Sequence, residues 1–190
     1  MTPDTSGPET LVAEAVSALG RSGSAAHAAL EALGAPLYVT DADGRVVFCT
    51  SAVARVAGRT PRIGEDRYCV SHRLYTADGE PLPHEECPMA VAVRERRAVR
   101  GVEAIAERPD GTRIPVLPFP TPIFDEDGVF RGAVNLFVDL TDSKRADYLN
   151  AQAKRCRRLA QTIGDKDTVD TLARMAEEYD AQASALERPH

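Results

Sequence analysis

Short turns built on Asp-Gly separate β-prone stretches of this chain, and they limit the folds that it can adopt. Three of these turns end at Gly44, Gly111 and Gly128. Because glycine readily takes the positive φ of a tight turn, each one can fold an extended strand back onto its neighbour. The sequence therefore predicts antiparallel hairpins. The expected strands cover residues 37–40, 45–49, 101–108, 112–124 and 129–138.

The strand expected at residues 112–124 contains three prolines. Pro118, Pro120 and Pro122 have the same parity, so they remove successive backbone donors from one side of the strand. We therefore expect a bulge or a missing stretch of ladder hydrogen bonds in the middle strand of the last three.

Helical patterns lie before and between the hairpins. Apolar residues recur on one face over residues 9–19, and a second short pattern covers residues 25–33. Each pattern has one narrow apolar stripe, which suits docking onto a sheet or onto a partner's equivalent helix. A capping Thr-Ser pair favours another helix at residues 50–58, and a first-turn proline favours one at residues 88–97.

Residues 141–190 follow a different pattern. Apolar residues repeat at heptad spacing through Leu149, Cys156 and Ile163, and then at alternating three and four positions from Val169 to Leu186. The first segment is mostly basic and the second mostly acidic, which predicts an antiparallel helical hairpin with Cys156 in its core. One hairpin buries little, but two from a dimer would form a four-helix bundle.

Composition restricts the functional class. The 190 residues allow one domain with appendages. We expect a tail and an amphipathic helix over residues 1–24, the main domain over residues 25–141 and the hairpin over residues 142–190. The net charge of −6 argues against a nucleic-acid partner. No apolar run approaches the roughly 20 residues that span a bilayer, so we expect a soluble cytoplasmic protein without a membrane partner.

Two cysteines and two histidines mark the stretch between the second and third expected strands. The spacing is Cys69-x-x-His72 followed by His84-x-x-Cys87, and four such side chains could hold a tetrahedral Zn²⁺. Iron, or haem held by one of them, is an alternative. The simpler interpretation makes the cysteines small buried residues and the histidines hydrogen-bonding groups. In that case the four residues, with Met89, line a ligand pocket without metal.

Other chemistry has weaker support in the sequence. Redox sensing by Cys69 or Cys87 would need a depressed thiol pKa, which the nearby Arg67 and Arg73 could cause. His27 lies on an alanine-rich helix and is expected to be solvated. No phosphate-binding loop, nucleophile elbow or His-Glu-x-x-His motif points to an enzyme.

Three motifs in this order resemble those of a PAS domain. They cover residues 38–48, 107–112 and 132–141, and the last ends in the Asp-x-Thr that closes many PAS domains. The resemblance spans roughly residues 25–145 and implies an α+β fold. That fold has a five-stranded antiparallel sheet, with helices on one face enclosing a small-ligand pocket. It also implies dimers and signal transfer through terminal helices. Residues 74–89 resemble a subgroup that is common in bacterial sensor histidine kinases.

The chain departs from the family in two ways. Many PAS domains have Asn-Pro where Thr50-Ser51 stand here, so the hydrogen bond usually made by that Asn is not expected in the same form. No kinase, cyclase, methyl-acceptor or DNA-binding region follows, and the tail has no histidine before His190, so we expect a sensor without its own effector. The Asn-Cys-Arg motif of flavin-based light sensors is missing as well, which disfavours flavin.

Two functional hypotheses follow from the resemblance. In the first, the module senses a small molecule, metal or redox change and relays it to a partner such as a histidine kinase or another effector. Asp139 and Thr141 would then couple the sheet to the tail. In the second, side chains fill the pocket and the module is an interaction or dimerisation adaptor. A cavity of at least about 300 Å³ between the long helix and the central strands would favour sensing, whereas a packed interior would favour the adaptor.

Overall fold

The computed structural model describes residues 7–20 and 24–186, except for the side chains of residues 142–144. Its internal contacts divide it into a unit from Pro8 to Asp139 and a second unit that contains the chain from Leu140 onward. The expected N-terminal tail up to residue 6, the linker at residues 21–23 and the chain end with His190 lie outside the described residues. None of the described helices is long and apolar enough to cross a bilayer.

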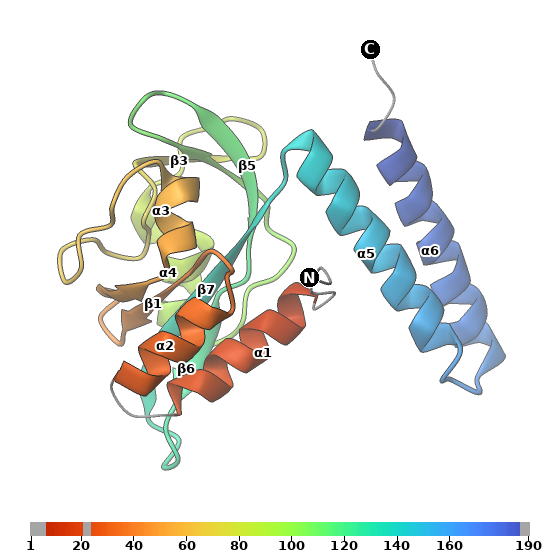
Figure 1. The fold of residues 1–190 in the computed structure, drawn as a ribbon, viewed down its shortest axis with the longest axis horizontal. Helices are drawn as coiled ribbons and strands as arrows, with labels where there is room; N and C mark the ends of the chain where they lie inside the picture. The colour runs from red at the N-terminus through yellow and green to blue at the C-terminus, as the bar shows by residue number, and fades with distance from the viewer. Residues whose placement is uncertain (1–6, 21–23, 187–190) are drawn as a thin grey trace. The chain divides into compact units, whose positions relative to one another are not determined.

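The first unit is built on one antiparallel sheet (Figure 1). The described residues form seven strands: β1 (Leu37–Asp41), β2 (Val46–Cys49), β3 (Arg73–Thr76), β4 (Ala104–Glu107), β5 (Arg113–Pro118), β6 (Thr121–Phe124) and β7 (Phe130–Asp139). Their order is β2-β1-β7-β5-β4-β3, and β6 also pairs with β7. The α+β fold with an antiparallel sheet is therefore confirmed.

Two differences raise the expected five strands to seven. The expected middle strand breaks at Phe119 and Pro120, so it forms β5 and β6, and the irregularity predicted from its prolines is confirmed. The other difference is β3, which lies in a stretch with turn chemistry on its C-terminal side. It pairs with β4, and the amide of Leu82 closes a tight hairpin on it by donating to Leu74 O at 2.9 Å.

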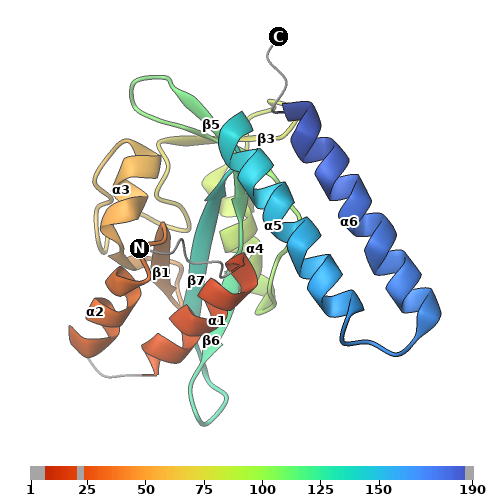
Figure 2. The same cartoon turned by 45° about the vertical axis from the view of Figure 1, so that its right-hand side comes forward.

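Helices cover both faces of the sheet (Figures 1 and 2). In the first unit they are α1 (Pro8–Leu19), α2 (Ser24–Ala32), α3 (Ser51–Ala57) and α4 (Pro88–Glu95), with a single 3₁₀ turn at His84–Glu86. On one face, α3 and α4 contribute Val53, Met89 and Val93 to the main core. On the other face, α1 packs against β7 and buries Val12, Ala15 and Ala18. The docking of the N-terminal apolar stripe onto a sheet is thus confirmed.

Thr50, which stands where many PAS domains have Asn, makes its own buried hydrogen bonds. It is 1% exposed, and its hydroxyl donates to Ala35 O at 2.8 Å and accepts from the amide of Leu37 at 3.2 Å. These bonds tie the start of α3 to the start of β1. The exposed His27 stacks on Phe48 with ring centroids 4.5 Å apart, so the solvated histidine also covers an aromatic ring.

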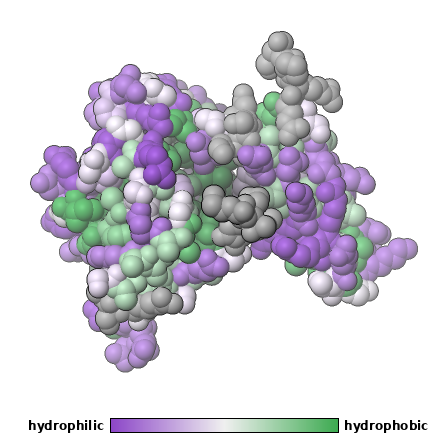
Figure 3. All heavy atoms as spheres, in the orientation of Figure 1, coloured by the Kyte–Doolittle hydropathy of each residue, from purple (hydrophilic) through white to green (hydrophobic). Residues whose placement is uncertain are grey.

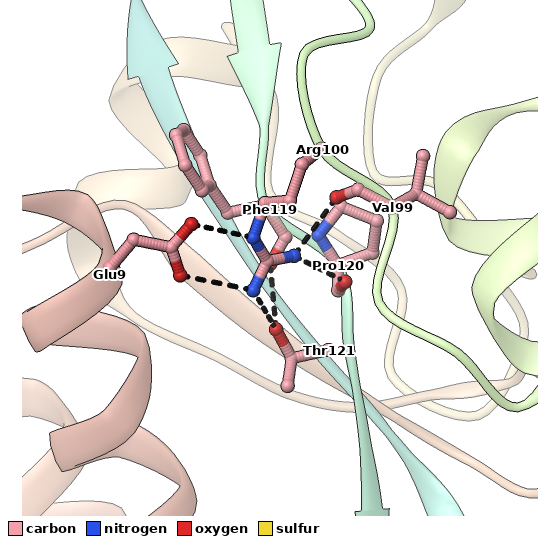
Figure 4. Close-up of polar contacts among 6 residues, drawn as sticks. All are labelled: Glu9, Val99, Arg100, Phe119, Pro120 and Thr121. Atoms are coloured by element: carbon pink, nitrogen blue, oxygen red, sulfur yellow. Dashed lines mark hydrogen bonds and ion pairs between the residues drawn. The ribbon is translucent and has the colours of Figure 1, made fainter. Parts of the chain in front are cut away.

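Arg100 joins α1 to the break between β5 and β6 (Figure 4). Its guanidinium donates to both carboxylate oxygens of Glu9, at 2.8 and 3.3 Å. It also donates to Val99 O and Pro120 O, each at 2.9 Å, and to Thr121 Oγ1 at 2.8 Å. One side chain therefore satisfies the acceptors that the broken strand exposes and also holds the first turn of α1.

Arg100→Gln should loosen α1 more than Glu9→Gln does. Glutamine cannot reach all the acceptors of the guanidinium, so several lose their donor, and we expect a cost of about 2 kcal/mol. Glu9 is 42% exposed, and solvent screening limits the effect of its neutralisation to under about 1 kcal/mol. Amide hydrogen exchange in α1 and urea unfolding would measure both. Glu14→Gln, on an exposed part of the same helix, is the control. Equal effects of all three substitutions would contradict the role of Arg100 in holding the first turn of α1.

The second unit contains the predicted helical hairpin. Helices α5 (Asp142–Ala160) and α6 (Lys166–Leu186) pack along each other through two small clusters. One cluster joins Leu149 to Ala183 and the other joins Cys156 to Ala176, so the helices run antiparallel. Arg157 pairs with Asp180 across them. The hairpin is confirmed, and its surface in Figure 3 is mainly hydrophilic.

Candidate functional site

The two cysteines of the Cys/His stretch lie in the core of the first unit. Cys69, Cys87 and Met89 are 3%, 2% and 1% exposed. Cys87 precedes α4 as its N-cap, and its sulfur accepts from the amide of Ala90 at 3.5 Å. The sulfur of Cys69 accepts from the amide of Ser71 at 3.5 Å. These three members of the expected site are therefore buried packing residues, and the two cysteine sulfurs have local backbone partners.

A short polar network crosses this core. The Tyr38 hydroxyl donates to Tyr68 O at 2.7 Å and accepts from Asn135 Nδ2 at 3.2 Å. Cys87 Sγ also lies 3.9 Å from Tyr68 O as a weak donor. Tyr68 has a φ of 59°, which is unusual for a residue other than glycine, and this backbone directs its carbonyl to both donors. Asn135 Oδ1 is buried and has no partner among the described residues.

The interior is almost completely filled. A cavity of about 10 Å³ lies between α4 and the central strands, where Tyr38, Cys69, Cys87, Met89 and Asn135 are among its lining residues. Such a volume is at the lower limit for one water molecule. Pockets that take organic ligands measure roughly 300–1,000 Å³, so this interior fits neither haem nor flavin.

Burial also controls the chemistry of the two thiols. It raises the pKa of Cys87 to about 12, and the neighbouring Cys69 adds to the rise. Burial raises the pKa of Cys69 too, and its hydrogen bonds to Ser71 only partly oppose this. The expectation that Arg67 and Arg73 lower a thiol pKa is therefore wrong, because desolvation of the thiolate is the largest effect. Neither thiol has the depressed pKa of a reactive cysteine.

Stability should fall with rising pH because of these thiols. In the unfolded chain they ionise near pH 9, but in the folded chain Cys87 keeps its proton to about pH 12. The stabilising effect is therefore complete below pH 9 and is lost as the pH rises, by about 1.4 kcal/mol per pH unit and thiol. Urea unfolding at pH 7.5 and about 10 would measure it. The Cys69→Ser/Cys87→Ser variant should lose less unfolding free energy between these two pH values. An equal loss in the variant and the original chain would refute the assignment of the effect to the thiols.

The two histidines lie nearer the surface than the thiols, and Cys69 lines one of the two depressions that they share. The exposed His72 and the half-buried His84 both line an open groove of about 510 Å³ beside β3. They also line an adjoining depression of about 300 Å³. Burial lowers the pKa of His84, and Glu85 partly opposes this. The histidines thus stand where two surface depressions meet.

The four expected metal ligands do not form a preformed metal site. Within the described ranges, no group of three or more His, Cys, Asp or Glu side chains is arranged to hold a metal ion. The structure brings Cys69 and Cys87 together in the core, and His72 and His84 together at the groove. Zinc or iron binding by all four stays a prediction without geometric support.

The remaining expected site residues lie at the junction of the two units. Asp139 is the last residue of β7, and Thr141 is the N-cap of α5. Both belong to the segment that connects sheet and hairpin. Their role in signal coupling stays a prediction.

Sequence reasoning missed several residues that shape these sites. Arg59 and Asp66 form a 2.7 Å ion pair beside the histidines, and Asp66 also lies 3.6 Å from Arg62. They occur in the polar residues 59–67, where no hydrophobic periodicity singles them out. Asn135 had a usable signal, because it is a polar residue inside the apolar run of β7. No feature of the sequence predicted the positive φ of Tyr68.

Comparison with known proteins assigns the fold. The family described as PAS fold matches residues 30–145, more than half of the chain. A search of curated proteins found no match.

Solved structures resemble the chain more distantly. The PAS domain of the fruit-fly ELK potassium channel is 17% identical with a TM-score of 0.46, over 56% of this chain and 87% of that one. The Rhodobacter sphaeroides LOV protein is 16% identical with a TM-score of 0.44, over 96% and 99%. The light-state dimer of the fungal blue-light photoreceptor Vivid is 20% identical with a TM-score of 0.40, over 55% and 76%. Because these TM-scores are below 0.5, they support no argument about ligands or partners.

Proposed function

The chain belongs to the PAS fold family, and on that premise we propose that it is a cytoplasmic, non-enzymatic signalling module. It acts through protein contacts and holds no ligand in its interior. One observation carries the proposal: only about 10 Å³ is free between α4 and the central strands. This is far below the roughly 300 Å³ that an internal ligand requires. The interaction adaptor is therefore favoured over a sensor with an internal pocket.

The terminal helices are the proposed means of contact. The second unit presents Leu159, Ile163 and Met175 as exposed apolar side chains on an otherwise hydrophilic hairpin. A two-helix hairpin buries only small clusters, so pairing with a second copy into a four-helix bundle would bury more apolar surface. We propose a homodimer that presents its helices to a separate signalling protein, such as a histidine kinase or another effector. Sedimentation equilibrium of the full chain tests the dimer.

The composition of the purified protein tests the filled interior. The full chain, prepared without added metal or chelator, should show no absorption band above the protein range. Its native mass should equal that of two polypeptides, with no added ligand mass. Elemental analysis should find no stoichiometric metal. About one equivalent of zinc, iron or an organic ligand per chain, lost in the Cys69→Ser/Cys87→Ser variant, would overturn the proposal. The alternative function, sensing by the Cys/His stretch, would then hold.

Asp139→Ala tests the relay between sheet and hairpin. A carboxylate just before a helix N-terminus stabilises that helix by about 0.3–1 kcal/mol, so its removal should speed amide exchange in the first turns of α5 about two- to fivefold. Exchange in α6 should change less. Asp127→Ala, in the exposed turn before β7, is the matched control. Unchanged exchange in α5 would argue against coupling through Asp139.

A further inference from the structure

The two surface depressions beside the histidines differ in chemistry. The larger one runs along β3, where Leu74, Tyr75 and Leu82 give it a mainly apolar lining. The smaller one is polar and is lined by Arg59, Arg62 and Arg67 together with one carboxylate, that of Asp66. His72 and His84 line both depressions and so mark their junction. The combined groove has an apolar arm and a cationic arm.

The cationic arm has a donor without an acceptor. The side chain of Arg59 is only 20% exposed, and its Nη2 pairs with Asp66 at 2.7 Å. Its Nε is buried and has no partner among the described residues. A buried donor of this kind is costly unless something accepts from it. The three guanidinium groups face two carboxylates, those of Asp66 and of Glu65, which pairs with Arg62 at 3.1 Å. One positive charge is left over, so an anionic acceptor is favoured.

We propose that this groove binds a small organic acid with an apolar body. Its carboxylate would lie in the cationic arm by Arg59, between the histidines and Arg62. Its hydrocarbon part would lie along β3 over Leu74 and Leu82. Each depression, at about 510 and 300 Å³, is within the size range of small-ligand sites. The site goes beyond the proposed function, because a module with a filled core would receive its chemical signal on the outside.

The groove and the core share a wall. Cys69 lines both the cationic arm and the small internal cavity, and Leu74 lines both the apolar arm and that cavity. β3 also belongs to the same sheet as β7, through β4 and β5. A ligand in the groove would therefore press on side chains that pack directly against the central strands.

The experiment is an NMR titration of the isotope-labelled full chain with hexanoate. Hexanoate should shift the ring signals of His72 and His84 saturably and leave those of His27 unchanged. Acetate, which lacks the apolar body, and 1-hexanol, which lacks the charge, should each bind at least about tenfold more weakly. The affinity for butyrate should lie between those for acetate and hexanoate.

Two variants locate the carboxylate. Arg59→Gln should weaken hexanoate binding about tenfold or more. Arg62→Gln, whose side chain is 69% exposed, should also weaken it and serves if Arg59→Gln does not fold. Arg97→Gln, outside the groove, should bind as the original chain does.

Several results would overturn the proposal. One is the absence of saturable histidine shifts up to about 20 mM hexanoate, because a dissociation constant above that concentration is too weak for a specific site. Another is equal binding of hexanol or acetate, which would leave an apolar patch or a plain anion site. Equal weakening by Arg97→Gln would point to a general charge effect. Tighter binding of N-acetyl-glycyl-leucine would reassign the groove to a peptide terminus.

Discussion

Gly132→Ala is expected to destabilise the first unit by roughly 3 kcal/mol or more, the largest effect of any single methyl group that we foresee. Gly132 lies in β7 between two neighbours, paired with Asp41 of β1 on one side and Ile123 of β6 on the other. Its φ is +144°, and a Cβ there would lie 1.9 Å from Thr40 O. That oxygen belongs to the backbone of a central strand, so the sheet itself would have to move.

Urea unfolding followed by circular dichroism would measure the cost, and Gly111→Ala provides the matched control. Gly111 also has a positive φ, of +84°, but nothing lies within 4 Å of the added Cβ. Its substitution carries only the strain of the left-handed backbone, about 1 kcal/mol. If both variants lost the same stability, the close approach of β1 and β7 at Gly132 would not be the cause.

These two glycines also show how far the sequence could predict the fold. The turn at Gly111 is encoded locally, by Asp-Gly between two β-prone stretches, and it was predictable together with the other hairpins. The need for glycine at position 132 comes from the crossing of β7 with β1, whose residues are far away in the sequence. No local pattern contains that information. The same holds for β3, whose partner strand begins about thirty residues later.

In the candidate site, too, locally encoded features were predictable and features set by distant contacts were not. The cysteines were predictable as small buried residues, because that is the usual state of free cysteine. The equal spacing of the two Cys/His pairs suggested a common centre, but the cysteines point into the core whereas the histidines line the surface groove. Which side of a short irregular segment each residue faces depends on the positive φ at Tyr68 and on the edge strand β3. Neither feature was visible in the sequence.

Met89→Ala is expected to cost about 3 kcal/mol, within the usual range for truncating a buried large side chain. Met89 is 1% exposed on α4 and lines the small internal cavity. Because the residues that line this cavity come from five strands of the sheet and from α4, the space that it leaves cannot close without moving the sheet. Val102→Ala, just before β4 with 44% exposure, should cost under about 0.5 kcal/mol. Thermal and urea unfolding would measure both.

Binding of benzene to the cavity of the Met89→Ala variant tests whether the interior of the original chain is filled. An engineered apolar cavity of this kind can bind benzene, so benzene should restore part of the lost stability of Met89→Ala, because a ligand that binds only the folded state stabilises it. The original chain should gain nothing from benzene, since about 10 Å³ admits no such molecule. A gain in the original chain, or a cost below about 1 kcal/mol for Met89→Ala, would mean that the interior opens readily. In that case a ligand inside the sheet and helices would again compete with protein contact as the signal that this PAS module receives.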